Sequence, residues 1–298
     1  MLNRRDFNSG LCALGLSAAC RAETAARGPA LWTVRQGRAT VFLFGQMPVR
    51  TDTVWLTPRI NAAFTSSAVL WLENPEFSQT TPEVMAAVNE LNRRNAPEPG
   101  YTVLNALPAN DVQRLRSVLA AEGMQPEALN GIPPRDVRLL LSNVADRRTG
   151  ADFKSIPEAL LRSRAKTAAK PVRTEWRDLL DIVSWSIDLP KTVGLDLVRM
   201  ALDDIDGVKD YPTALRSWAN GDLKFQEAAV RALARQYPEL TRRLGSERNA
   251  AWVEKIRGML AEGNTQFVCI GISHLVGPDG VPQLLRDAGL RVRGGSSS

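Results

Sequence analysis

The residue whose type most directly suggests chemistry is His274, the only histidine in the 298-residue chain. It follows a short, continuous apolar segment, residues 267–270, and the glycine at position 271. That segment has the length and β-branching of a strand buried on both faces. Ligands of open α/β sheets bind just beyond the carboxyl ends of such strands. His274 therefore either belongs to a binding site or only hydrogen-bonds the backbone of its own loop.

Two glutamates also follow segments that read as strands. Glu73 comes directly after the apolar segment 68–72, and Glu175 ends a shorter segment that starts at residue 171. A carboxylate at the end of an apolar strand is costly to desolvate unless it is paired or bound to a cation. The position of Glu73 is explained either by a bound cation or by an ion pair with an arginine such as Arg248.

The elements that must position these side chains are short strands separated by helices. Strands are predicted for segments 31–34, 39–44, 68–72, 171–175, 267–270 and 290–292. A glycine between the first two favours a hairpin. Thr57 and Pro58 have the residue types of a helix start. Ser246 is expected to cap a later helix, which ends at Gly263.

Between residues 82 and 169 the apolar residues recur mostly at helical spacing, and prolines separate the helices. We interpret this stretch as a helical insertion that shapes access to the sheet.

The composition narrows the class of protein. Apolar residues make up 44% of the chain and charged residues 23%, which is ordinary for a globular protein. The net charge of +6 is mild, and no basic stripe with interleaved aromatic residues occurs, so nucleic acid is excluded as a partner. Of the cysteines only Cys269 lies beyond residue 27, which excludes a cysteine–zinc site. We expect Cys269 to be a small core residue.

Residues 1–27 have the pattern of an export signal. An arginine pair, residues 4–5, precedes an apolar stretch, residues 10–19, that is too short to span a bilayer. The arginine pair together with Phe7 resembles a twin-arginine signal, and the residues up to Cys20 resemble a lipoprotein processing site. We therefore expect a periplasmic or cell-envelope protein that contacts the membrane only through this signal or through lipidation at Cys20.

One pattern occurs twice: an apolar strand, a glycine, two residues, and a position aimed into a loop. It appears as VFLFG-QMP, ending at Pro48, and as FVCIG-ISH, ending at His274. Together with LWTVRQGRATVFLFG, with Arg248-Asn249 and with GISHLVGPDG, it makes the chain resemble proteins of the TraB/GumN family, which includes the Tiki peptidases. The resemblance covers most of the chain beyond the export signal. In that family both positions are typically histidine, in GxxH motifs.

The resemblance implies an α/β fold, with a mixed central sheet built from duplicated strand–loop–helix halves and a largely helical insertion. The family domain would cover residues 28–293, the insertion about residues 82–169, and a disordered tail residues 294–298. For Tiki-like members the resemblance also implies metal-dependent hydrolysis of peptides.

Family site residues carry over to five positions of this sequence. The resemblance implies that Glu73, Glu175 and His274 would bind a divalent metal such as Mn, Co, Zn or Fe. Arg248 would orient a carboxylate or bind a developing oxyanion. Asn249 would hydrogen-bond a loop or a substrate. The implied substrate is a peptide or a protein.

The chain departs from the family at Pro48, which has no side-chain ligand atom, and no second histidine can replace it. Two hypotheses follow. The first is an exported metal-dependent hydrolase with a reduced ligand set. The second is a catalytically degenerate relative that acts as an envelope binding or scaffolding protein, in which Glu73 and Arg248 form only a buried ion pair. A serine hydrolase built on Ser273 and His274 is disfavoured because no G-x-S-x-G elbow occurs.

Overall fold

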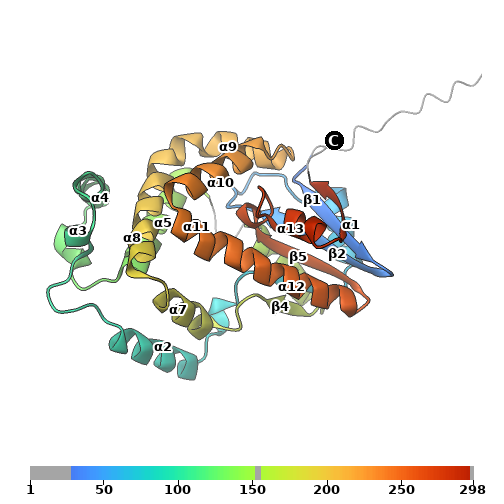
Figure 1. The fold of residues 1–298 in the computed structure, drawn as a ribbon, viewed down its shortest axis with the longest axis horizontal. Coiled ribbons are helices and arrows are strands. Elements are labelled where there is room, and N and C mark those ends of the chain that lie inside the picture. Colours follow the sequence, from blue (N-terminus) through green and yellow to red (C-terminus); the bar gives the residue numbers. More distant parts are fainter. Residues whose placement is uncertain (1–27, 152–155, 296–298) are drawn as a thin grey trace, which may run out of the picture.

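A computed structural model describes residues 28–151 and 156–295, which form a six-stranded sheet with helices on both sides (Figure 1). The sheet is mixed, as the sequence predicted, and the α/β fold class is confirmed. The export signal expected at residues 1–27 lies outside the described residues, as do residues 296–298 of the expected tail.

All the strands expected from the sequence are present. They are β1 (Leu31–Gln36), β2 (Ala39–Gln46), β3 (Val69–Leu72), β4 (Val172–Thr174), β5 (Thr265–Gly271) and β6 (Arg291–Gly295). The strand order is β4-β3-β5-β2-β1-β6. β4, β3, β5 and β2 run parallel, whereas β1 is antiparallel to both of its neighbours. The carboxyl ends of four strands therefore meet at one edge of the sheet.

β5 lies in the parallel part of the sheet between two other strands, and this position explains why its sequence is continuously apolar. It pairs with β3 on one side and β2 on the other, and residues 267–270 are all fully buried. Cys269 is a core residue, as predicted, and burial raises the pKa of its thiol well above the ordinary value.

Helices fill the connections between these strands. They are α1 (Pro58–Ser66), α2 (Pro82–Arg94), α3 (Val103–Ala106), α4 (Ala109–Ala121), α5 (Pro134–Thr149), α6 (Pro157–Thr167), α7 (Leu179–Ile187), α8 (Lys191–Asp206), α9 (Tyr211–Ala219), α10 (Lys224–Gln236), α11 (Pro238–Thr241), α12 (Glu247–Ala261) and α13 (Val281–Asp287). The helical character expected for residues 82–169 is confirmed in the described parts of that range, residues 82–151 and 156–169. Helices α3, α4, α5 and α8 share an apolar core of their own, apart from the core of the sheet.

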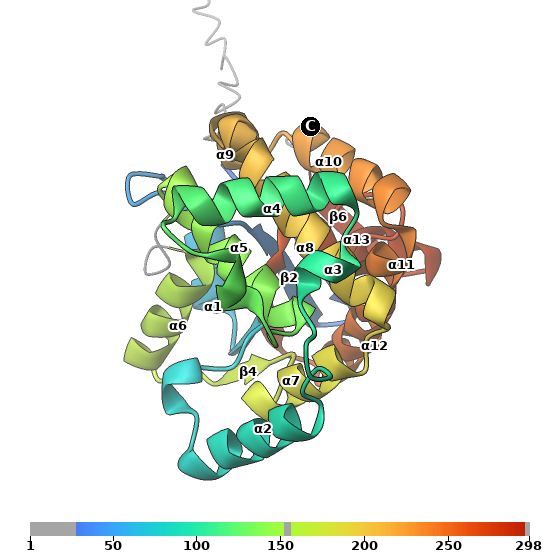
Figure 2. The ribbon, with the colours of Figure 1, turned by 90° about the vertical axis from the view of Figure 1, so that its left-hand side faces the viewer.

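The sheet lies between two helical layers. Figure 2 shows α1 and α6 on one side of β2, and α12 and α13 on the other. Helices α2 and α7 pack against each other below this body (Figure 1). In the described part of the chain, no helix has both the length and the apolarity that a membrane crossing requires.

The two expected helix caps have different outcomes. At α1, Thr57 Oγ1 accepts a hydrogen bond from Ile60 N at 3.4 Å, so that prediction is confirmed. Ser246 does not cap α12, and that prediction is wrong. It has helical φ and ψ of −57° and −42°, at the end of a π-helical turn, Arg242–Ser246, that joins α11 to α12. The preceding turn already supplies carbonyl acceptors to α12, and the Ser246 hydroxyl donates to Asp279 instead.

The C-terminal strand is longer than the domain boundary at residue 293 suggested. Gly294 and Gly295 belong to β6 and lie opposite Trp32 and Leu31 of β1. Their φ angles of 88° and 108° favour glycine, and a Cβ atom on Gly294 would lie 2.3 Å from Leu31 O. Glycine thus lets the chain continue along β1, so the disordered tail expected at 294–298 does not begin at residue 294.

Gly45, the glycine of the first repeated motif, is needed because β2 passes close to the turn after β5. A Cβ atom there would lie 2.3 Å from Ile272 Cδ1 and 3.1 Å from Ile272 Cα. We expect Gly45→Ala to lower the free energy of unfolding by about 1–3 kcal/mol through overpacking, measured by urea denaturation. The control is Gly258→Ala in α12, where a Cβ atom meets nothing within 4 Å. That variant should be neutral or stabilising, and equal losses in both variants would contradict the packing explanation.

Candidate functional site

The carboxyl edge of the parallel strands brings together the side chains singled out from the sequence. Glu73 is the first residue after β3, Glu175 is the first after β4, and His274 ends the 3₁₀ turn after β5. Arg248 and Asn249 reach the same edge from the first turn of α12. All five residues therefore lie in one group, which we call the carboxyl-edge cluster.

Arg248 lies between the two glutamates and hydrogen-bonds both. Its Nη2 atom is 2.8 Å from Glu73 Oε1 and 2.6 Å from Glu175 Oε2, and its Nε atom is 2.9 Å from Glu175 Oε1. Its side chain is 16% exposed. Burial lowers the pKa of Arg248, but the hydrogen bonds and charges of the two glutamates outweigh burial and raise it above its ordinary value. The structure confirms the ion pair of Glu73 with Arg248 that the sequence left open.

Aromatic side chains surround the bond between Arg248 and Glu175. Trp252, one turn along α12, donates from Nε1 to Glu175 Oε2 at 3.1 Å. The Arg248 guanidinium carbon lies 5.7 Å from the centre of the Trp176 ring, and the Trp176 and Trp185 rings are 5.4 Å apart. The sequence analysis missed Trp176 and Trp185. The available signal was the position of Trp176 directly after Glu175.

Glu73 is held from three directions. Its Oε2 atom accepts a hydrogen bond from Gly271 N at 2.8 Å, and its Oε1 atom lies 3.5 Å from His274 Nε2. A Cβ atom on Gly271 would lie only 3.3 Å from Oε2, so glycine allows this close approach. Burial raises the pKa of Glu73, but the hydrogen bond and charge of His274, together with Arg248, lower it well below its ordinary value of 4.5.

Asn249 orients His274. This contact bears on whether His274 belongs to a binding site or only hydrogen-bonds the backbone of its own loop. His274 Nδ1 lies 2.7 Å from Asn249 Oδ1, and Asn249 Nδ2 donates to Asp279 O at 2.7 Å. Because the Asn249 amide gives its N–H to Asp279, its oxygen is left to accept from Nδ1–H. The remaining ring nitrogen, Nε2, is thereby directed at Glu73. His274 thus belongs to the cluster, and Asn249 hydrogen-bonds a loop, one of its two predicted roles.

The degenerate first motif is built differently from the second. Pro48, at the position of the family histidine, offers only its backbone oxygen, which accepts from the Tyr211 hydroxyl at 3.1 Å. Gln46 of the same motif instead binds Glu158 twice. Its Nε2 donates to Glu158 Oε2 at 3.1 Å, and its Oε1 accepts from Glu158 N at 3.3 Å.

Glu158 is a third carboxylate at this edge and is a buried residue, and the sequence analysis missed it. Only 5% of the residue is exposed, and its Oε1 accepts from Asn74 N at 3.3 Å and lies 3.2 Å from Arg162 Nη2. Burial and then the charge of Glu73 raise the pKa of Glu158, despite Arg162 and Asn74. It begins a helix rather than ending a strand, so no strand pointed to it. The signal present was a glutamate directly after a helix-starting proline.

The comparisons with known proteins identify the family of the chain. The model of the TraB/PrgY/gumN family matches residues 30–294. The chain belongs to the TraB/PrgY/gumN family. None of the curated proteins and none of the solved structures matches it.

The metal ligand set that the family resemblance implied can be compared with this geometry. Glu73, Glu175 and His274 do lie at one edge, but Arg248 occupies the space between the two carboxylates. The carboxylate oxygens are engaged by Arg248, Trp252, Gly271 and His274. Across residues 28–151 and 156–295, no three His, Cys, Asp or Glu side chains are grouped to hold a metal ion. As arranged, the three side chains do not fit a shared metal, and a divalent metal remains a prediction.

Removing Arg248 should be strongly destabilising. The change Arg248→Ala leaves two desolvated carboxylates facing each other, so we expect the free energy of unfolding to fall by about 3–5 kcal/mol. Urea denaturation followed by circular dichroism measures this. The control is Arg257→Ala on the same helix, whose exposed pair with Glu254 at 3.4 Å should contribute about 0–1 kcal/mol. Equal losses in the two variants would contradict a central role for Arg248.

Glu73 should make the folded state sensitive to acid. Because its folded pKa lies below its ordinary value of 4.5, its ionised form stabilises the fold. This contribution is complete above the unfolded pKa and is lost as the pH falls through that value toward the folded pKa. We expect the urea midpoint of Glu73→Gln to decrease less than that of the wild type as the pH falls below about 5. Urea unfolding curves recorded from pH 7 to pH 3 measure this. Glu98→Gln, at an exposed glutamate, should leave the slope unchanged.

Proposed function

We propose that this member of the TraB/PrgY/gumN family is an exported cell-envelope protein whose carboxyl-edge cluster is an ion-paired binding site rather than a metal centre. The observation that carries the proposal is Arg248, which bonds Glu73 at 2.8 Å and Glu175 at 2.6 Å. A guanidinium in that position repels a cation and uses the lone pairs that a metal would need.

The departure at Pro48 supports the same conclusion. In place of an imidazole, the first motif presents a backbone carbonyl at Pro48 and the Gln46 amide, which is already bound to Glu158. The first motif therefore supplies no imidazole, either to bind a metal or to transfer a proton. His274 alone is left from the GxxH pair, and its Nδ1 is bound to Asn249.

A peptide segment of a protein partner is the ligand we propose for this site. Trp176 is half-buried beside Arg248, the half-buried Trp185 lies against the Trp176 ring, and the apolar helix α7 has no fully buried residue. Aromatic and aliphatic side chains of this kind bind apolar peptide side chains. The site can therefore combine apolar contacts with hydrogen bonds from the cluster.

The second candidate is the metal-dependent peptide hydrolase that the family resemblance implied. The convergence of Glu73, Glu175 and His274 on one edge favours it. This function requires Arg248 to leave the space between the glutamates, so that their oxygens become available to the ion.

Metal content distinguishes the two functions. The protein beginning at residue 28 would be loaded with Mn, Co, Zn or Fe, desalted, and examined by elemental mass spectrometry beside His274→Ala and Arg248→Ala. We expect no stoichiometric metal in the wild type and no peptide cleavage. One metal per chain that is lost in His274→Ala, together with cleavage of a peptide library, would contradict the binding-protein proposal. Metal bound only by Arg248→Ala would show that Arg248 blocks the oxygens of Glu73 and Glu175, and it would support the binding-protein proposal.

A further inference from the structure

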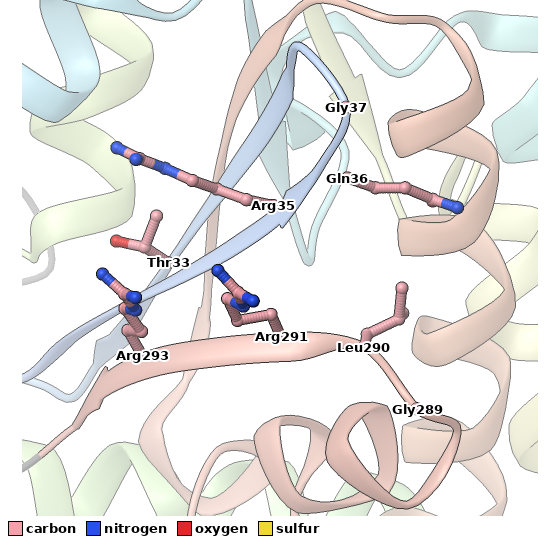
Figure 3. Close-up of a pocket in the computed structure, with 8 residues that line it drawn as sticks. All are labelled: Thr33, Arg35, Gln36, Gly37, Gly289, Leu290, Arg291 and Arg293. Carbon is pink, nitrogen blue, oxygen red and sulfur yellow. The ribbon is translucent and has the colours of Figure 1, made fainter.

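A separate group of charges lies at the other end of the sheet, where β1 pairs with β6. Arg35 lies opposite Arg291, and Thr33 lies opposite Arg293. Residues that are paired directly across two strands point to the same face. Three guanidinium groups and one hydroxyl therefore gather on one face, as Figure 3 shows. We call these four residues the arginine face.

The arginine face is far along the sheet from the carboxyl-edge cluster. Arg35 pairs with Thr40, near the amino end of β2. The cluster lies beyond the carboxyl ends of the parallel strands, past Gln46 at the other end of β2. A ligand at the arginine face therefore does not depend on the function proposed for the cluster.

The three arginines lack acidic partners among the described residues. Each is exposed, and none takes part in an ion pair there. On the opposite edge strand, β4, Arg173 is by contrast paired with Glu262 at 2.6 Å. Like charges placed directly opposite each other on adjacent strands destabilise a sheet. Arg35 and Arg291 are such a pair, and no carboxylate of the described chain forms an ion pair with either of them.

The arginine face borders a hollow of about 610 Å³. Its remaining lining comes from Gln36, Gly37 and the turn Gly289–Leu290, and no carboxylate lines it. The glycines and the short turn leave the backbone open to a ligand. A concave surface with three cations and no anion attracts an anionic group and repels a cationic one.

We propose that Arg35, Arg291, Arg293 and Thr33 form a binding site for a phosphate-bearing ligand. The planar guanidinium presents two parallel N–H groups that match two oxygens of a phosphate. The Thr33 hydroxyl can donate a further hydrogen bond. Bound phosphate supplies the negative charge that the three arginines lack, and it relieves the repulsion between Arg35 and Arg291.

Edge-strand protection is the structural alternative. Charged residues on an edge strand hinder pairing with another sheet, and β6 is the edge strand here. Protection needs exposed charge alone. A phosphate site also needs the guanidinium geometry, and it predicts saturable binding that decreases as the salt concentration rises. Binding experiments therefore separate the two explanations.

The test uses the chain from residue 28 onward and the triple variant Arg35→Gln, Arg291→Gln and Arg293→Gln. Binding of inorganic phosphate is measured by titration calorimetry. Binding to vesicles of phosphatidylglycerol mixed with phosphatidylcholine, and to vesicles of phosphatidylcholine alone, is measured by cosedimentation. A matched control removes the same charge elsewhere, at three exposed residues outside ion pairs of the described chain: Arg116→Gln, Lys224→Gln and Arg235→Gln.

We expect a loss of affinity of at least about tenfold in the triple variant and less than about twofold in the control. Binding of inorganic phosphate would assign a soluble phosphate compound. Binding of phosphatidylglycerol vesicles without inorganic phosphate would assign a lipid headgroup. Binding to neither, or equal losses in the variant and the control, would overturn the proposal. The single change Arg291→Lys keeps the charge but not the paired N–H groups, and it should also weaken binding.

The urea midpoint of the triple variant distinguishes a loss of binding from a loss of folding. Removing like charges that face each other should leave the urea midpoint of the triple variant unchanged or raised. A lowered midpoint together with lost binding would show that the arginines serve the fold, and it would overturn the proposal.

Discussion

The structure of the carboxyl edge depends on one desolvated contact, the guanidinium of Arg248 between Glu73 and Glu175. The two carboxylates come from the ends of β3 and β4, and the guanidinium comes from α12. Leaving one of these charges unpaired would cost several kcal/mol, so the contact favours this relative position of the three elements. The contact therefore fixes where α12 lies across the sheet, in addition to neutralising the strand ends.

The edge treats its carboxylates in two opposite ways. Glu73 is surrounded by Arg248, His274 and a backbone N–H group, which favour the ionised form and lower its pKa. Glu158 lies nearby with less compensation, and its pKa is raised. Pairs of acids whose environments push their pKa values apart are a common feature of functional sites. Here burial and the charge of Glu73 raise the pKa of Glu158, and Gln46 of the first motif hydrogen-bonds Glu158 without adding positive charge.

Most of the fold could be predicted because its signals are local. Continuous apolar segments marked β2, β3 and β5, and the glycine turn marked the first hairpin. The position of His274 followed from the strand before it. Ser246 shows the limit, because a capping residue type cannot reveal that the preceding helix continues through it. The extension of β6 through Gly295 depended on a partner strand distant in sequence.

The site could be predicted as a set of residues but not as an arrangement. Five positions were predicted, and an ion pair of Glu73 with Arg248 stood as one alternative. Arg248 can bind both glutamates because β3 and β4 are neighbouring strands in the sheet. The spacing of residues in the sequence does not encode which strands are neighbours. Glu158 was missed for the same reason, because its proximity to Glu73 is created by packing of α6 against β3 and β5.

The pairing of β2 with β5 has a consequence for the order of folding. Its register joins Thr40 to Thr265 and Gln46 to Gly271, so the centre of the sheet forms only when distant parts of the chain meet. Contacts of such wide separation form slowly. The core shared by α3, α4, α5 and α8 does not include the sheet, and we expect it to consolidate earlier. Because His274 follows β5, we expect the carboxyl edge to be assembled after this helical core.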